Sequence, residues 1–394
     1  MSGKAVHAGC SPRIAAGEPE DAPASGPVSP PFTLLGPADT FPIGGAWADL
    51  AANAVEANPF FAPYMLAPAL SHLGGGKTKL LCLWEGEGLS RRLIGLLPLA
   101  PSRGYARLPV AYLETWIYRH CFFGAPLVRR GREEAFWKAL FSFADAQGRA
   151  FLRLPLLDED GPLIAALKAS VSPHRFVYAS DIHERAMLHG GYRAEEFAAA
   201  HIRKKRLKEM ARRRNRLSER APLSFRMLGD WDDLEEWART FLALEHGGWK
   251  GKADTSFMAD PNDTRFLLEM LKGARAAGAL QFLRLDSGDH AIAMMINLGR
   301  GDAVYGFKIC HDEAYARFSP GVMIGMDLLK AMEGMAQDAF LDSCAAPDHP
   351  MINSLWPGRR RIAGYNIACA GAFGGAVLRA CRTLEQLAKK ARSL

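Results

Sequence analysis

The sequence has no closely spaced pair of cysteines and no long apolar run. Its seven cysteines are scattered over 394 residues, and none belongs to a Cys-x-x-Cys motif. Disulfide frameworks and zinc sites depend on such spacings, so we expect reduced thiols, no metal site and a cytoplasmic protein. No segment reaches the roughly 20 apolar residues that cross a bilayer. The basic start and apolar middle of a secretory signal are also missing, so neither export nor an integral membrane segment is predicted.

The composition is typical of a globular α/β protein. Hydrophobic residues make up 49% and charged residues 23% of the chain, and its length is sufficient for two or three domains. Residues 1–40 differ, because they are rich in Pro, Ala, Gly and Ser and contain no continuous apolar run. They cannot bury enough surface to offset the entropy of ordering, so we expect a disordered tail there.

The two halves of the chain show the same order of predicted elements. In the first half, a helical pattern over 133–147 ends at Gly148 and leads to an apolar strand over 150–156. In the second half, a helical pattern over 322–336 leads to a strand over 339–344. In each half, an amphipathic helix with a tryptophan comes first. Strands separated by turn signals come next, and this helix and strand follow them. Such self-similarity predicts one α/β fold used in tandem.

Helical spacing and alternation predict the remaining elements. Asn58 precedes a proline and should end the first helix, because such a residue is pushed out of the helical basin. The segment 362–378 is mostly apolar but rich in Gly and Ala, so we interpret it as a buried helix rather than a membrane anchor, with an amphipathic helix over 378–394. Helices are expected at 47–58 and 231–244, and strands at 79–84, 92–99, 280–285, 291–298 and 303–309.

One turn between a predicted strand and a predicted helix offers a candidate anion site. Ser319-Pro-Gly321 follows the strand at 303–309 and opens the helix at 322–336. Serine is a good cap and proline fits the first helical turn, so free amides and the positive end of the helix dipole point outward there. These groups suit a phosphate or another anion. The alternative is that the tripeptide only turns the chain.

Four short motifs follow one another over residues 244–356, and two weaker ones lie in the first half. The weaker ones are Asn58-Pro-Phe-Phe61 and Gly124-Ala-Pro-Leu-Val128. The stronger motifs are Leu244-Glu-His-Gly-Gly-Trp-Lys-Gly251, Gly306-Phe-Lys-Ile-Cys-His-Asp-Glu-Ala-Tyr-Ala316, Phe318-Ser-Pro-Gly321, and Asp348-His-Pro350 with Trp356. Together the motifs resemble the GNAT superfamily of acyltransferases, specifically the tandem-domain group described as cellulose-biosynthesis or BioF-associated acetyltransferases, which is distantly similar to the Fem aminoacyltransferases.

The resemblance implies two tandem GNAT-like lobes with mixed α/β sheets, and an N-acetyltransferase-like enzyme that moves an acyl group from acyl-CoA to an amine or hydroxyl. Acyl-CoA, such as acetyl-CoA, would be a co-substrate rather than a permanently bound cofactor. The acceptor would be a small molecule or a glycan precursor of polysaccharide or envelope metabolism. We therefore expect a disordered tail over 1–40, an N-terminal lobe over 41–185, a basic connecting helix within 186–224, a C-terminal acyltransferase lobe over 225–366 and a C-terminal helix over 367–394.

The loop that should bind the donor departs from the pattern of the family. GNAT enzymes usually hold the CoA pyrophosphate with a loop of the form Gln/Arg-x-x-Gly-x-Gly/Ala. Here the corresponding run is Arg317-Phe-Ser-Pro-Gly-Val-Met-Ile-Gly325, whose glycines are farther apart. An aminoacyl-tRNA or another activated donor therefore stays open as an alternative.

Acyl transfer needs a polarised donor carbonyl, an acceptor that loses a proton, and alignment of the two. The resemblance implies that backbone amides of a splayed strand hold the carbonyl, so no catalytic triad need be visible. Each candidate also has a structural reading, as a solvated turn, a surface loop or an exposed strand residue. The catalytic candidates are Asp312, Glu313, His349, Glu245 and Lys308; the donor-binding candidates are Arg317, Ser319, Pro320 and Gly321; the substrate-binding candidates are Trp249, Lys250, Asp342 and Trp356.

A basic segment separates the two halves. Ten basic residues lie between Arg203 and Arg220, more than the net charge of +7 for the whole chain. Leu207, Met210 and Leu217 recur at helical spacing, which predicts a basic helix with a thin apolar stripe. It could join the lobes as a solvated helix, border a phosphate-binding donor site, or bind tRNA, a membrane surface or another anionic partner.

These observations predict an acyltransferase with the donor at Ser319-Pro-Gly321 and the acceptor in the cleft between the lobes. The rival hypothesis is a catalytically idle GNAT-like protein that binds an anionic partner through the basic segment, or a Fem-like transferase that uses aminoacyl-tRNA there. Labelled acyl-CoA with a panel of amines distinguishes these hypotheses. The sequence identifies neither the acyl chain, the acceptor nor the oligomeric state.

Overall fold

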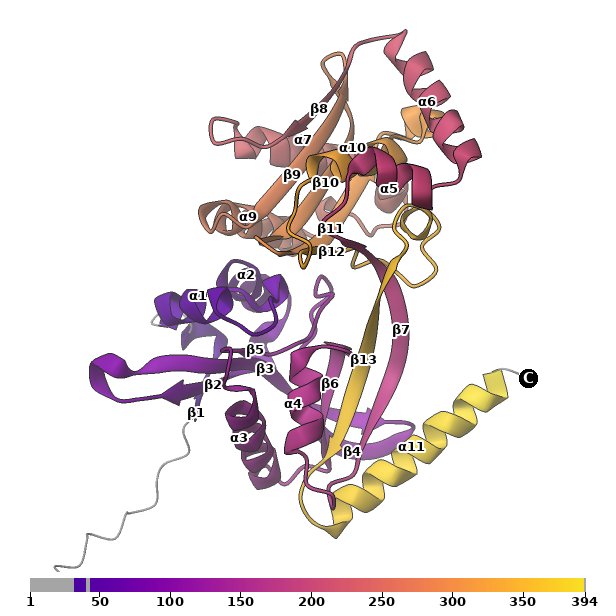
Figure 1. Ribbon diagram of the computed structural model, residues 1–394. Coiled ribbons are helices and arrows are strands. Elements are labelled where there is room, and N and C mark those ends of the chain that lie inside the picture. The colour runs from indigo at the N-terminus through magenta and orange to yellow at the C-terminus, as the bar shows by residue number, and fades with distance from the viewer. Residues whose placement is uncertain (1–31, 40–42, 393–394) are drawn as a thin grey trace, which may run out of the picture.

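The computed structural model describes residues 32–39 and 43–392. Two lobes are stacked in Figure 1, and two long strands run between them, β7 (Val177–His189) and β13 (Gly358–Ala368). No helix within the described ranges is both long and apolar enough to cross a membrane.

The first lobe packs helices against an antiparallel sheet with one parallel pair. Its elements are β1 (Phe32–Leu35), α1 (Gly44–Ala52), α2 (Pro63–His72), β2 (Lys79–Glu85), β3 (Arg92–Tyr105), β4 (Leu108–Thr115), β5 (Leu127–Val128), α3 (Glu133–Ala146), β6 (Phe151–Asp158) and α4 (Pro162–Ser170).

The second lobe repeats this pattern after two helices that connect it to β7. Its elements are α5 (Ala194–His201), α6 (Lys204–Ser218), β8 (Leu223–Met227), α7 (Leu234–Gly247), α8 (Trp249–Lys252), α9 (Pro261–Ala276), β9 (Leu280–Ser287), β10 (His290–Arg300), β11 (Ala303–His311), the short helix η7 (Glu313–Phe318), α10 (Pro320–Ala331) and β12 (Phe340–Asp342). The chain ends in α11 (Ala372–Arg392).

The repeat predicted from the sequence is visible in the order of the strands. The described residues form one 13-stranded sheet, in which the first lobe contributes β1-β2-β3-β4-β6-β13 and the second, read from the other edge, β8-β9-β10-β11-β12-β7. The parallel pairs β4–β6 and β11–β12 occupy the same place in each series. The expected mixed α/β fold with tandem lobes is confirmed.

The last strand of each lobe is exchanged with the other lobe. β7 follows the first lobe in sequence but pairs with β12, whereas β13 follows the second lobe and pairs with β6; the two also pair with each other. The boundaries expected at residues 185 and 366 therefore fall inside strands. Neither lobe is a single continuous stretch of chain.

The segment 362–378 is not one buried helix, so that expectation is wrong. Residues up to Ala368 belong to β13, and α11 begins at Ala372. Successive residues over 362–368 of β13 are buried, so this part of the strand is largely apolar and does not alternate. Periodicity alone cannot distinguish such a strand from a buried helix.

Other helices and strands differ from expectation mainly at their ends. The helix expected at 133–147 is confirmed as α3, and the one at 322–336 corresponds to α10, which is shorter. α1 ends at Ala52 rather than Asn58, whose side chain instead accepts a hydrogen bond from the Phe60 amide. The tail expected over 1–40 lies mostly outside the described residues, but residues 32–35 form β1 and pair with β2.

The hydrophobic core is continuous across the two lobes. It includes Trp47 and Trp137 in the first lobe and Trp237 in the second. At the junction α2 packs on α9, where a Cβ on Gly273 would lie 2.9 Å from that of Tyr64. A separate core in the second lobe lies beneath α10. The two cores cover opposite faces of β10 and β11.

Candidate active site

A cavity of about 520 Å³ opens in the second lobe where β11 and β12 part. The strands pair in parallel only over 303–305 and 340–342. At the next position, a Cβ on Gly306 would lie 2.8 Å from the carbonyl oxygen of Ser343. Residues 306–311 of β11 then line one wall without a β12 partner. All the lining residues come from the second half of the chain.

The start of α10 forms one end of this cavity. Ser319 occupies the N-cap position but has a left-handed backbone, with φ 59°, and its side chain does not cap the helix. Its hydroxyl oxygen instead accepts a hydrogen bond of 2.5 Å from Arg213 on α6. Gly321 faces β11, because a Cβ there would lie 3.7 Å from Ile309. A cation and a helix N-terminus therefore adjoin the cavity at the same point.

Lys308 lies on the face of β11 that points away from α10, in an aromatic environment. Its ammonium nitrogen lies 5.2 to 5.3 Å from the ring centroids of Phe122, Phe257 and Phe307. Burial, and secondarily the positive charge of Lys250, lowers the pKa of Lys308 to about 8. A substantial fraction of Lys308 is therefore a neutral amine near physiological pH, which an exposed lysine is not.

Glu245 on α7 and Lys250 on α8 line the cavity as an ion pair. The Lys250 ammonium donates to a Glu245 carboxylate oxygen at 2.7 Å and to the Ile309 carbonyl at 3.3 Å. The other oxygen of Glu245 accepts from the Phe257 amide at 2.9 Å. Both oxygens of Glu245 are thus engaged, and this carboxylate holds Lys250 in position.

The remaining lining residues from the predicted set surround the entrance and the wall beside α10. Trp249 is 60% exposed, whereas Trp356 is buried. His349 accepts a hydrogen bond at Nδ1 from the Ile352 amide, which leaves its other nitrogen as the one that can donate. Glu313 is exposed, with its carboxylate 3.9 Å from His311.

Three predicted residues lie outside the cavity lining, and two of them, Asp312 and Arg317, lie at η7. Asp312 accepts hydrogen bonds from His290 at 2.7 Å and from the Ala314 amide at 2.9 Å, where it caps η7. Burial would raise the pKa of Asp312, but these two hydrogen bonds hold it below its usual value. Arg317 is exposed and lies over the Phe318 ring. Asp312 is therefore an ionised helix cap rather than a free base.

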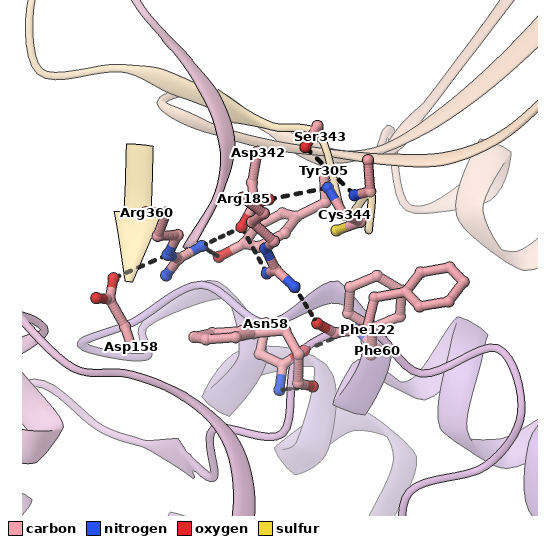
Figure 2. Close-up of polar contacts among 12 residues, drawn as sticks. Asn58, Phe60, Phe122, Asp158, Arg185, Tyr305, Asp342, Ser343, Cys344 and Arg360 are labelled. Carbon is pink, nitrogen blue, oxygen red and sulfur yellow. Dashed lines mark hydrogen bonds and ion pairs between the residues drawn. The ribbon is translucent and has the colours of Figure 1, made fainter. Parts of the chain in front are cut away.

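Asp342 lies behind the cavity, in a buried polar network between the lobes (Figure 2). One of its oxygens accepts from Arg185 on β7 at 2.6 Å and from Arg360 on β13 at 2.9 Å. Burial would raise the pKa of Asp342, but these two guanidinium groups hold it below its usual value. Its other oxygen accepts from the amide of Cys344, which lines the cavity. Asp342 is thus placed to connect the exchanged strands and fix the cavity wall.

The structure brings ten of the thirteen predicted residues to one cavity. It also shows two polar residues that the sequence did not single out. Arg213 bonds Ser319 beside the cavity, but it was one of ten similar cations, and nothing in the sequence distinguished it. Asn297 on β10 lines the cavity. A polar residue between apolar Ile296 and Leu298 was a signal that could have been used. The ten are Glu245, Trp249, Lys250, Lys308, Glu313, Ser319, Pro320, Gly321, His349 and Trp356.

Comparison with known proteins identifies the part of the chain that carries this site. Residues 204–340 match the family model described as an acetyltransferase (GNAT) domain. No curated protein sequence matches the chain significantly. The predicted cellulose-biosynthesis or BioF-associated group stays a prediction.

Two of the solved structures compared, with TM-scores of at least 0.50, share the fold at low sequence identity. A conserved protein of unknown function from Bacteroides thetaiotaomicron VPI-5482 is 13% identical with a TM-score of 0.51, over 87% of this chain and 100% of that one. FemX is 9% identical with a TM-score of 0.50, over 82% and 95%. A tandem GNAT protein from the clavulanic acid biosynthesis pathway is 16% identical with a TM-score of 0.39, over 86% and 99%.

The matched residues run from the start of α6 to the start of β12 and include most of the cavity wall. The part of the chain that is similar to an acetyltransferase (GNAT) domain therefore carries most of the site.

Proposed function

We propose that the protein is an acyltransferase that moves an acyl group from acyl-CoA to an amine or hydroxyl of a small acceptor, within the cavity of the second lobe. The observation that carries this proposal is the shape of that cavity. It joins a helix start with an adjacent arginine to a partly neutral lysine through an opening between two parallel strands. A donor can span such an opening with its anionic end at α10 and its thioester beside β11.

The anionic end of the donor binds at Ser319 and Gly321, with Arg213 as the cation. Helix amides and the helix dipole favour a phosphate group there, and a guanidinium forms charge-assisted hydrogen bonds with phosphate. Arg213 takes the place of the glycine-rich loop that the sequence lacks. The extended arm of the donor then follows the edge of β11 that has no β12 partner, where backbone groups are available for hydrogen bonds.

Lys308 acts as the general base in this proposal. Its neutral amine accepts a proton from the acceptor as the acceptor nitrogen or oxygen attacks the thioester carbonyl carbon. The new bond to the acceptor forms, the carbon–sulfur bond breaks, and the thiolate of CoA leaves with the electron pair. The proton held by Lys308 passes to that thiolate or to solvent. A base with a pKa near the working pH is the most effective for such a transfer.

Acetyl-CoA binding tests the donor assignment without a known acceptor. Titration calorimetry should detect binding to the wild-type chain, and Arg213→Ala should weaken it by about tenfold, because a hydrogen bond to a charged group contributes about 1.5–3 kcal/mol. Arg216→Ala is the matched control, since Arg216 is an exposed cation on the same helix. Equal affinities of the two variants, or no binding by the wild type, would reject the donor site.

The rival function is binding of an anionic partner by the basic helix α6. The helix supports this function less strongly than the cavity supports acyl transfer. Several cations on α6 already have partners within the protein: Arg212 and Arg213 pair with Glu209, and Arg214 with Asp327 on α10. This side of α6 is therefore bound to α10. If labelled acetyl-CoA gave no product with any amine in a panel while an anionic polymer bound tightly, the binding-protein hypothesis would replace the acyltransferase.

A further inference from the structure

Asn297 is a buried side chain with no partner at the closed end of the cavity. It is 1% exposed, and neither its amide nitrogen nor its amide oxygen has a hydrogen-bond partner. Leaving such a group unsatisfied costs about 1–3 kcal/mol, and buried polar groups in folded proteins are nearly always paired. The cost is explained if a ligand completes these hydrogen bonds.

The position of Asn297 indicates which part of a ligand it would meet. It lies opposite Gly306, the first residue of β11 beyond the last pair with β12. Because Gly306 has no side chain, nothing on β11 covers Asn297 at this point. Asn297 shares a face of β10 with Met295, which belongs to the core beneath α10. It therefore faces the α10 side of the cavity, at the end where the strands meet.

The donor reaches this end with its acyl group. Its anionic end lies at Gly321, where a Cβ would lie 3.7 Å from Ile309 and 4.0 Å from His311 at the far end of β11. From His311 back to Gly306 the strand covers roughly 17 Å at about 3.3 Å per residue, so an extended arm brings the far end of the donor to Asn297. This step rests on the function proposed above.

The chemistry at the closed end favours an uncharged polar group. Asn297 offers one acceptor and two donor hydrogens, all neutral. Buried Trp356 also lines the cavity, and its indole N–H has no partner. The nearby lining residues Met295, Cys344 and Ala345 carry no charge. The carboxylate of Asp342 is already held by two arginines.

We propose that Asn297 recognises an uncharged hydrogen-bonding substituent on the acyl chain, so that the enzyme takes a hydroxylated acyl group in preference to a plain hydrocarbon one. A site built to hydrogen-bond a hydroxyl discriminates strongly against an analogue that lacks it, because its own polar groups then stay unpaired. A simple acetyl group would leave Asn297 unsatisfied.

Two thioesters that differ by one hydroxyl test the proposal. Calorimetric titration of the full chain with butyryl-CoA and with each enantiomer of 3-hydroxybutyryl-CoA should show at least one enantiomer binding about tenfold more tightly than butyryl-CoA, equivalent to roughly 1.4 kcal/mol. Asn297→Leu should reduce this ratio to about one or invert it. Equal wild-type affinities, or a ratio unchanged by Asn297→Leu, would overturn the proposal.

Gln281 provides the matched control. It lies directly opposite Asn297 on β9 and its buried side-chain oxygen is also unpartnered, but it does not line the cavity. Gln281→Leu should leave the selectivity ratio unchanged. Asn297→Leu without ligand should unfold at the wild-type temperature or above, because it removes an unpaired buried amide. Marked destabilisation or failure to fold would instead assign Asn297 to a structural pair with Gln281 and overturn the proposal. Binding of none of the thioesters would overturn the donor site itself, and this inference with it.

Discussion

The two lobes share a strand order but differ where their parallel strands part. In the second lobe, the space beyond 303–305 and 340–342 is a cavity. In the first lobe, β4 and β6 pair at Leu113 and Glu114, and the chain itself then closes the opening. The amide of Gly124 donates to the Leu156 carbonyl at 2.8 Å, so a loop lies against β6 at the corresponding place.

The starts of the corresponding helices differ as well. α10 begins at Ser319 and Pro320, next to the guanidinium of Arg213. α3 begins after Arg132, whose side chain pairs with Glu85 on β2 rather than with a hydroxyl at the helix start. One fold can therefore serve as a binding site or as a support, depending on whether a loop fills the gap between two strands.

The first lobe supports the site from behind. Its residue Phe122 forms part of the aromatic environment of Lys308, and the Phe122 carbonyl accepts from Arg185 at 2.6 Å. Its residue His120 donates to or accepts from Asp263 on α9 at 3.1 Å, and burial lowers the pKa of His120 to about 2. The loop that closes the first opening is thus the loop that desolvates the lysine in the second.

The largest expected effect comes from removing that lysine. Lys308→Met should lower turnover of acetyl-CoA with a reactive amine by at least a hundredfold, because a positioned general base contributes about 10²–10⁴-fold. Lys138→Met, on an exposed surface of the first lobe, should leave turnover unchanged. Steady-state kinetics and thermal unfolding on the same preparations separate catalysis from folding. Wild-type turnover in a folded Lys308→Met protein would move the role of base to His349 or Glu313.

The buried network between the lobes should dominate stability. Asp342→Asn leaves Arg185 and Arg360 without their shared carboxylate and should cost about 3–5 kcal/mol in the free energy of unfolding. Asp158→Asn should cost less, since Asp158 is more exposed and bonds only Arg360 within this network. Denaturant titration measures both. Equal losses would show that the strand exchange does not depend on Asp342.

The network also predicts how stability depends on pH. The pKa of Asp342 is lower in the folded protein than the usual value of about 3.9, so its contribution is complete above that value. The contribution is lost as pH falls through the folded pKa, because the unfolded chain then binds more protons. The difference in unfolding free energy between wild type and Asp342→Asn should therefore shrink below about pH 4. A difference that stays constant to pH 2 would contradict this account.

Alanine substitutions of the two glycines at the openings should distinguish a structural role from a role in donor binding. An alanine at 124 would place its Cβ 2.2 Å from the Pro155 carbonyl oxygen, and one at 306 would place it 2.8 Å from that of Ser343. Both variants should lose about 1–3 kcal/mol of stability through overpacking. Only Gly306→Ala should also weaken acetyl-CoA binding. If Gly124→Ala weakened binding equally, the first lobe would be part of the donor site.

The account also predicts how the rate depends on pH. Because the folded pKa of Lys308 is about 8, below its usual value, the neutral amine becomes more abundant as pH rises. The apparent kcat/KM should rise about tenfold per pH unit below 8 and level off above it. Lys308→Met should remove this rise of kcat/KM with pH. If kcat/KM instead levelled off near pH 6.5, the base would be an ordinary histidine.

The sequence predicted what depends on local pattern. Helices such as α3 and α7, the hairpins and the tandem order follow from periodicity and turn residues. Ten predicted residues line the cavity because motifs in one strand and the next loop meet at one opening. The exchange of β7 and β13 was not predictable, because which lobe a buried strand joins depends on distant partners. Asn297, Arg213 and the burial of Lys308 by Phe122 likewise depend on contacts between segments far apart in the chain.

Hydrogen exchange with and without acetyl-CoA tests the central claim most directly, that the donor binds in the second lobe and not in the first. We expect acetyl-CoA to protect amides in two segments, 306–311 along β11 and 319–325 at the start of α10. Amides at 113–118 and 124–128, at the closed opening of the first lobe, should exchange at the same rate with and without the ligand. Protection confined to the first-lobe segments would contradict the account.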